Sequence, residues 1–304
     1  MGCIGTWLTS GFRKEEPAHD FIQESRLSDK RLQICKVEWQ YRMRYMRISC
    51  DLHLHSNHSD GENTIEEMCQ AASEKGFTTV CFTEHFDMNP EEEKYGYLDF
   101  DKYSDAVERA REKFSQKMIV LKGIEFGEPH LYRKEFEYVS GLDLDFILAS
   151  IHYVEDFGAY WDDEIRLQPG YPVQRLFESY YQEVLKAIEF GGFDAIAHID
   201  FPKRYFTENH EPDSLLDSIV KMLVDKKIAL EINGNGGVGE VHPSNYICDL
   251  YAKNGGKIVT VGSDAHSSDR IGQNFNRITD ILQVYAFQPV CFFQRNEIAL
   301  TESQ

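Results

Sequence analysis

The sequence predicts an α/β protein in which parallel strands alternate with helices, and three observations lead to this class. From Met46 onward, short apolar runs rich in β-branched residues recur, each followed by a longer segment that suits a helix. Strands that alternate with helices pair in parallel through right-handed crossovers. Six of the seven runs carry a His, Asp or Glu near their C-terminal end, where (β/α) barrels gather catalytic groups. We therefore expect a barrel rather than an open, doubly wound sheet.

The predicted strands are the apolar runs themselves. They span residues 48–55, 79–85, 119–127, 145–153, 193–200, 228–234 and 258–266. Two of the intervening segments, 64–76 and 173–192, have apolar residues at helical spacing. Both segments end in glycine, which commonly stops a helix.

The first 45 residues lack this alternation. Residues 11–34 are mostly polar, and no strand pattern appears before Met46. We therefore predict a leader at 1–45, either poorly ordered or translated from an upstream start, and one domain at 46–304.

The opening residues MGCIGT match the pattern for myristoylation of Gly2, with Cys3 as a second acylation site. So short a pattern is frequent by chance, and we do not predict membrane attachment from it. No secretory signal is recognisable, and no apolar run approaches the length of a membrane-spanning helix.

The charge balance is acidic, because 51 Asp and Glu against 32 Lys and Arg give a net charge of −19. Such a surface repels polyphosphate backbones, which argues against long nucleic acids as partners. A small anionic substrate is still compatible, because bound metal ions can reverse the local potential. The seven cysteines include no Cys-x-x-Cys pair, which fits a reducing compartment better than a disulfide framework. We therefore expect a cytoplasmic protein.

Histidines and carboxylates gather at the C-terminal ends of the predicted strands. His53 and His55 are two residues apart on a strand, so both side chains point to the same side and can bind one metal ion. Asp264 and His266 repeat this spacing on the last strand. With one group from each of the second to fifth strands and one from the first loop, the candidate metal ligands are His53, His55, Asp60, His85, Glu125, His152, His198, Asp264 and His266.

Six imidazoles and three carboxylates are too many for one ion, so we predict two or three divalent transition-metal ions bridged by a shared carboxylate. Mixed imidazole and carboxylate ligands suit zinc, manganese or iron. A single strand-end histidine is usually a packing residue, but six at the ends of five strands would repel one another without a cation. The remaining histidines are expected on the solvated surface; they are His19, His58, His130, His210 and His242.

Six segments carry a family resemblance. DLHLHSNHSDG, FTEH, GIEFGE, SIHY, AHID and GSDAH, in this order, resemble the motifs of the polymerase and histidinol phosphatase (PHP) superfamily. TEHFD, AHIDFPKRY, EIN and GGKIVTVGSDAHS are most similar to the PHP-type histidinol-phosphate phosphatases. The resemblance covers residues 46–295 and implies a distorted (β/α)7 barrel with a trinuclear metal centre.

The resemblance also divides the ligands among three ions. It places His53, His55, Glu125 and Asp264 on the first ion. Glu125 would bridge to a second ion held by His152 and His198. Asp60, His85 and His266 would hold the third.

The family implies hydrolysis of a small phosphorylated metabolite, with L-histidinol phosphate as the expected substrate and histidine biosynthesis as the pathway. Arg204 matches a phosphate-binding arginine of the family and would offer a planar donor fork, although a surface ion pair is the plainer interpretation. Asp87 and Asp200 are candidates by position for the acid that protonates the leaving group.

One arginine of the family pattern is absent. Histidinol phosphatases of this type usually carry a second arginine after the sixth strand, whereas this chain has no arginine or lysine between Glu231 and Lys253. The phosphate contact is then missing or supplied from elsewhere, with Arg270 and Arg295 as candidates. Two alternatives stay open: a PHP phosphoesterase acting on nucleotides or another small phosphate ester, and a noncatalytic metal-binding regulatory domain. The oligomeric state is not predicted.

Overall fold

The computed structural model describes residues 48–90, 96, 98–158, 160–206, 208, 210–236 and 240–300. The leader predicted at 1–45 lies outside these residues, as do the two acylation candidates, so these assignments stay predictions. Among the described residues, no helix combines the length and the apolar composition that crossing a bilayer requires.

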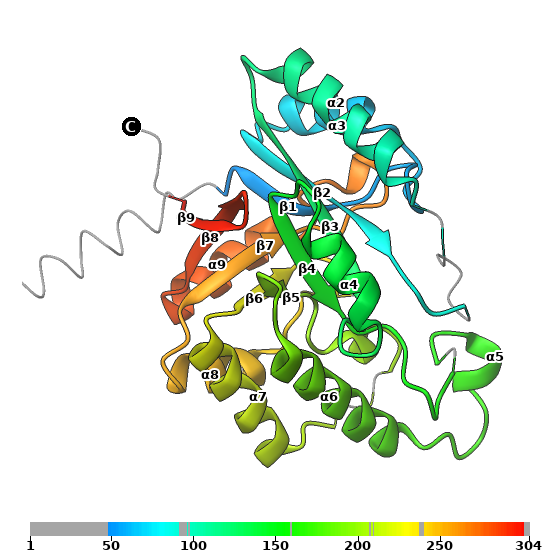
Figure 1. Cartoon of the computed structure of the whole chain (residues 1–304). Helices are drawn as coiled ribbons and strands as arrows, with labels where there is room; N and C mark the ends of the chain where they lie inside the picture. Colours follow the sequence, from blue (N-terminus) through cyan, green and yellow to red (C-terminus); the bar gives the residue numbers. More distant parts are fainter. Residues whose placement is uncertain are drawn as a thin grey trace, which may run out of the picture. The chain divides into compact units, whose positions relative to one another are not determined.

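The described strands form one sheet whose order follows the chain (Figure 1). They are β1 (Cys50–Leu54), β2 (Thr79–Phe86), β3 (Ile119–Gly127), β4 (Phe146–Ser150), β5 (Ala195–Ile196), β6 (Ala229–Asn233), β7 (Ile258–Gly262), β8 (Gln288–Phe293) and β9 (Asn296–Ala299). Each strand from β1 to β7 pairs in parallel with the next, and β8 pairs antiparallel with β9. The α/β class and the parallel order of the seven predicted strands are confirmed.

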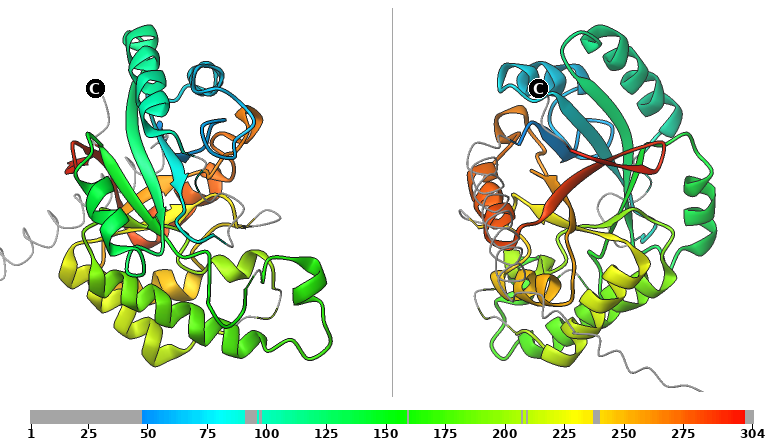
Figure 2. Two further views of the ribbon diagram at one scale, coloured as in Figure 1. Left: turned by 45° about the vertical axis from the view of Figure 1, so that its right-hand side comes forward. Right: turned by 90° about the vertical axis from the view of Figure 1, so that its left-hand side faces the viewer.

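Helices connect the strands, as the alternation predicts. They are α2 (Ile65–Glu74), α3 (Phe100–Phe114), α4 (Arg133–Ser140), α5 (Asp163–Arg166), α6 (Val173–Phe190), α7 (Asp213–Lys226), α8 (Asn245–Lys253) and α9 (Phe275–Tyr285), with short 3-10 turns η1 (Phe201–Arg204) and η2 (Ser268–Arg270). Helix α2 begins at a capping box in which Thr64 and Glu67 bond each other's backbone N–H, and Gly76 follows its end at φ 82°. Figures 1 and 2 show α6, α7 and α8 packed side by side.

The first and last strands of the predicted set, β1 and β7, are linked by hydrogen bonds at their C-terminal ends. The N–H of Asp264 donates to His53 O at 2.8 Å, and the N–H of His55 donates to Ala265 O at 3.0 Å. The end of β1 therefore bonds the segment that follows β7. Closure into a complete barrel stays a prediction.

Strands β8 and β9 were not predicted. The run that becomes β8 is short and contains Pro289, which lacks the N–H that a strand interior uses. β8 nevertheless pairs with the first two residues of β7, at Ile258 and Val259, and then turns back into β9. The sheet thus extends beyond the seven expected strands at the end where β7 begins.

Strands β1 to β7 are largely buried on both faces, as expected of parallel strands covered by helices, whereas β9 is exposed. All five residues of β1, β4 and β6 are buried, and β2 and β3 are buried over most of their length. Apolar side chains fill this core, while polar side chains gather where the strands end. The fold therefore brings residues far apart in the sequence to one end of the sheet.

Candidate metal centre

Glu125, on β3, lies at the centre of the polar cluster formed by the strand ends. Its Oε2 atom is 3.1 Å from His53 Nε2. The same oxygen is 3.4 Å from His55 Nε2 and 3.4 Å from His85 Nδ1. One carboxylate oxygen therefore faces three imidazoles carried by the first two strands.

The other oxygen of Glu125 faces the fourth and fifth strands. Its Oε1 atom is 3.0 Å from His198 Nε2 and 3.3 Å from His152 Nε2. A carboxylate whose two oxygens face different sets of imidazoles has the geometry of a bridge between two ions.

Asp264 closes the cluster from the segment after β7. Its Oδ1 atom is 3.5 Å from His55 Nε2, 3.7 Å from His53 Nε2 and 3.5 Å from His266 Nδ1. The backbone of Asp264 has φ 52°, a conformation that is uncommon outside glycine and concentrates at functional sites.

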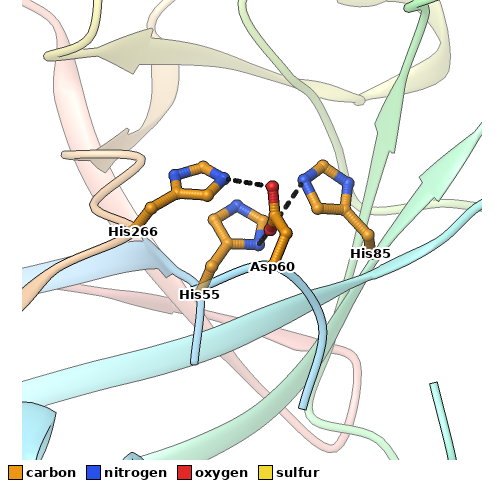
Figure 3. Close-up of side chains that lie close together, drawn as sticks. All are labelled: His55, Asp60, His85 and His266. Atoms are coloured by element: carbon orange, nitrogen blue, oxygen red, sulfur yellow. Dashed lines mark ion pairs between the residues drawn. The ribbon is translucent and has the colours of Figure 1, made fainter. Parts of the chain in front are cut away.

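Asp60 forms a further group with three histidines (Figure 3). Its Oδ2 atom is 3.1 Å from His266 Nε2. Its Oδ1 atom is 3.6 Å from His85 Nε2 and 4.0 Å from His55 Nδ1. These side chains come from the ends of β1, β2 and β7 and from the loop after β1, so this group assembles only in the folded chain.

The spacings fit shared metal ions. Two ligand atoms bound to one tetrahedral ion at about 2.0–2.2 Å lie about 3.3–3.6 Å apart. Four groups of the described side chains have ligand atoms within 4.8 Å of one another: His55, Asp60, His85 and His266; His53, His198 and Asp264; His53, His55 and Glu125; and His85, Glu125 and His152. Together these groups contain all nine predicted ligands.

His55 provides an independent test of this fit. It is fully buried, and neither of its ring nitrogens has a hydrogen bond among the described residues. Buried polar atoms are normally hydrogen-bonded, and an unsatisfied one destabilises the folded state. A metal ion bound to one of these nitrogens would give that atom the partner it lacks.

Two carboxylates of the cluster, Glu125 and Asp264, are held ionised although they are buried. Burial alone would raise the pKa of Glu125, but His53 and His85 beside it hold that pKa well below its ordinary value. Burial likewise opposes ionisation of Asp264, whereas Arg204 and His53 keep its pKa low. Asp60 and His266 are partly exposed, at 24% and 25% of their side chains, so solvent reaches the cluster on their side.

The sixth strand supplies a residue that sequence reasoning missed. Glu231 Oε1 is 2.6 Å from His53 Nδ1, and its Oε2 accepts the N–H of His198 at 2.8 Å and Asn233 Nδ2 at 3.0 Å. This contact fixes the His53 ring so that Nε2 faces Glu125. The only signal in the sequence was a glutamate inside an otherwise apolar run.

Glu231→Gln should weaken metal binding about ten- to a hundredfold, because the charged partner that orients His53 and raises its basicity is lost. Competition with a calibrated chelator measures this affinity. Glu108→Gln removes a carboxylate that pairs with Arg111 and Lys122, neither of which is a candidate ligand, and it should leave the affinity unchanged. Wild-type affinity in Glu231→Gln would show that His53 does not depend on this contact.

A second carboxylate that received no role from the sequence positions the loop of Asp60. Glu84, on β2, is buried and accepts hydrogen bonds from Ser56 N at 3.1 Å, Ser56 Oγ at 2.5 Å and Ser59 Oγ at 2.5 Å. The loop after β1 is thereby tied to β2, which brings Asp60 next to His85.

Arg204 reaches the cluster from the end of η1. Its Nη2 atom is 2.5 Å from Asp264 Oδ2, and its guanidinium lies over the Phe201 ring at 4.7 Å from the centroid. Arg204 does form an ion pair, as the alternative interpretation expected, but only 13% of its side chain is exposed, so this pair is largely buried rather than at the surface. Its Nε is buried without a hydrogen-bond partner in the described part of the chain.

The two candidate acids occupy different surroundings. Asp87 Oδ2 is 3.3 Å from His85 Nδ1, and its Oδ1 is 3.9 Å from His152 Nδ1. Asp200 is bonded instead to His242 Nδ1, at 2.6 Å. Burial would raise the pKa of Asp200, but His242 and other donors hold it well below its ordinary value.

The surface position expected for His242 is wrong, because this side chain is buried against Asp200. His58 and His210 are partly exposed, whereas only 8% of the His130 side chain is exposed and it pairs with Glu183. His19 lies outside the described residues.

The two arginines offered as substitutes for the absent one lie at opposite ends of the strands. Arg295 Nε is 2.5 Å from Asp194 Oδ2, and the backbone N–H of Arg295 donates to Asp145 O at 2.9 Å. Asp194 directly precedes β5 and Asp145 directly precedes β4. Arg295 therefore cannot contact a substrate at the metal cluster. Arg270 Nη2 donates to Asn235 Oδ1 at 2.8 Å, and Asn235 Nδ2 lies 3.3 Å from Asp264 Oδ2, which places Arg270 on the side of the cluster.

The fold and the cluster agree with comparisons to known proteins. The model of the PHP domain family matches residues 51–235, and the chain belongs to this family. A probable histidinol-phosphatase of Clostridium acetobutylicum is 30% identical over 256 residues, which cover 81% of this chain and 97% of that protein. The histidinol-phosphatase of Lactococcus lactis is 26% identical over 267 residues, covering 82% and 95%.

A solved structure gives the same fold. The crystal structure of histidinol phosphate phosphatase from Lactococcus lactis, complexed with zinc, L-histidinol and phosphate, superposes with a TM-score of 0.71. It covers 82% of this chain and 98% of that one at 22% sequence identity. The PHP resemblance inferred from the motifs is thereby confirmed.

Proposed function

We propose that this protein is a metal-dependent phosphatase that hydrolyses L-histidinol phosphate in histidine biosynthesis, in the cytoplasm. The observation that carries the proposal is the cluster of six imidazoles and three carboxylates centred on Glu125, in a chain of the PHP family. The relatives named histidinol-phosphatase support this particular substrate.

The cluster would hold two or three divalent ions of zinc, manganese or iron. Glu125 would bridge two of them, because its oxygens face separate sets of imidazoles. When bound, such ions supply a nucleophile at neutral pH and neutralise charge on the phosphoryl oxygens. Glu231 and Glu84 would keep His53 and the Asp60 loop in the geometry that the ions require.

Arg204 would bind the phosphoryl group. Its guanidinium is held between Phe201 and Asp264, beside the cluster, and its Nε has no hydrogen-bond partner in the described part of the chain. A guanidinium fixed in advance stabilises charge that develops in the transition state without reorganising. Arg270, linked through Asn235 to Asp264, would be the second cationic donor.

Asp87 is the better candidate for the leaving-group acid. It lies beside His85 and His152, at the cluster, and Gly127 opposite it leaves room where a Cβ would come within 2.5 Å of Asp87 Oδ1. Both oxygens of Asp200 are occupied by donors, which supports a different role for that residue.

The proposal is tested by turnover after reconstitution with zinc, manganese or iron. We expect more than one metal equivalent per chain and a higher kcat/KM on L-histidinol phosphate than on AMP or an aryl phosphate. Preference for AMP would favour the nucleotide phosphoesterase. Metal binding without turnover of any phosphate would favour a noncatalytic metal-binding domain, and at most one ion per chain would exclude the multinuclear centre.

A further inference from the structure

The carboxylate of Asp200 joins two segments at the C-terminal end of the sheet. Its Oδ1 atom is 2.6 Å from His242 Nδ1. Its Oδ2 atom accepts the N–H of Ser244 at 2.8 Å and lies 3.2 Å from Lys203 Nζ. Asp200 and Lys203 follow β5, whereas His242 and Ser244 lead into α8.

Glu211 completes a closed ring with three of these residues. Lys203 Nζ is 2.5 Å from Glu211 Oε1, and Ser244 Oγ donates to the same oxygen at 2.7 Å. Asp200, Lys203, Glu211 and Ser244 thus surround the start of η1 with polar contacts. Asp200 is buried, whereas the other three side chains are partly exposed, and hydrogen bonds that join a buried carboxylate to two segments restrain the local backbone.

His242 is anchored on its other side by β6. The N–H of His242 donates to Asn233 O at 2.9 Å, and the N–H of Asn233 donates to His242 O at 2.8 Å. Asn233 Nδ2 also bonds Glu231, which holds His53. His242 therefore connects Asp200 to the strand that supports the metal centre.

Arg204 depends on this arrangement through the short turn that carries it. η1 (Phe201–Arg204) begins directly after Asp200 and ends with Arg204. The guanidinium lies over Phe201, the first residue of the same turn, and pairs with Asp264. A shift at the start of η1 would move the guanidinium relative to the metal centre.

We propose that Asp200 and His242 are positioning residues that hold Arg204 in the place where it binds the phosphoryl group. The inference rests on the proposed function and assigns Asp200 to positioning rather than to proton donation. His242 would act through Nδ1 alone, since its Nε2 has no hydrogen-bond partner in the described part of the chain.

A double-mutant cycle between His242 and Arg204 tests the proposal in the metal-loaded full chain. His242→Leu should lower kcat/KM on L-histidinol phosphate about ten- to a hundredfold with bound metal unchanged, because a displacement of about 1 Å has effects of this size. In the Arg204→Ala background, the same substitution should change kcat/KM by less than about threefold, because the group it positions is gone. His242→Asn should recover most of the activity, since its amide can donate to Asp200 Oδ1 from the position of Nδ1.

Three results would overturn the positioning role. One is full additivity of His242→Leu and Arg204→Ala. Another is failure of His242→Asn to recover activity, which would assign the function to Nε2. The third is a loss confined to alkyl phosphates, with an aryl phosphate spared, because this pattern indicates proton donation to a poor leaving group.

Asp200→Asn, which preserves volume, repeats the cycle if His242→Leu does not fold. It should likewise lose little further activity in the Arg204→Ala background. A wild-type protein that hydrolyses no phosphate ester would refute the proposed function itself, whereas additivity in an active enzyme refutes only the positioning role.

Discussion

Glu125→Gln should lose both bound metal and phosphatase activity. Glu125 faces five imidazoles, and the substitution removes its charge while keeping its size. Bound metal ions contribute several kcal/mol of transition-state stabilisation, so kcat/KM should fall by about a thousandfold or more. Elemental analysis of the purified variant and turnover of L-histidinol phosphate measure the two losses together.

Glu183→Gln is the matched control for this substitution. Glu183 pairs with His130 and Lys186, neither of which is a candidate metal ligand, so its variant should retain wild-type metal content and turnover. A Glu125→Gln protein with full metal content would exclude Glu125 as the bridging ligand. Full metal content with lost activity would instead assign Glu125 to the chemical step.

Arg204→Ala should lower kcat/KM about a hundred- to a thousandfold while leaving bound metal unchanged. A charged donor to a transition-state oxyanion contributes about 3–4 kcal/mol. Asp264 keeps a hydrogen-bond donor in Asn235 when the guanidinium is removed, so its contact with the ions should persist. Arg204→Lys should recover only part of the loss, because an ammonium cannot reproduce the planar donor fork.

Arg175→Ala is the control, because this arginine forms an exposed pair with Asp156 and should be dispensable for turnover. The comparison is run on L-histidinol phosphate and on AMP. Near-wild-type turnover of both esters by Arg204→Ala would mean that another cation binds the phosphate, and Arg270→Ala is then the next variant to measure.

Much of the fold was predictable because apolar runs that indicate strands, and apolar residues at helical spacing, can each be recognised within a short stretch of sequence. The apolar runs at 79–85 and 119–127 became β2 and β3 with nearly the predicted bounds, and the segment at 173–192 became α6. The ligand candidates were also predictable, since parallel strands place their C-terminal ends at the same edge. Spacing within one strand sufficed to pair His53 with His55.

The supporting residues could not be predicted in the same way. Glu231, Glu84 and His242 act through partners that are 178, 28 and 42 residues away in the chain. The residues next to them in the sequence do not show whether such a side chain is buried with a distant partner or exposed at a strand end. β8 escaped prediction for a related reason, since its pairing with β7 is tertiary and its sequence contains a proline.

The contacts of Arg295 bear on how this protein can change during evolution. Asp145 and Asp194, which precede β4 and β5, bind Arg111, Arg295 and the N–H groups of Lys122, Ile147 and Gln294. These buried charges tie the β8–β9 hairpin to the strand starts, at the end opposite the metal cluster. Substitutions there can change the stability of the fold without changing the metal cluster. Substitutions in the loops at the other end can change substrate specificity without changing the strands. The two properties can therefore be selected separately.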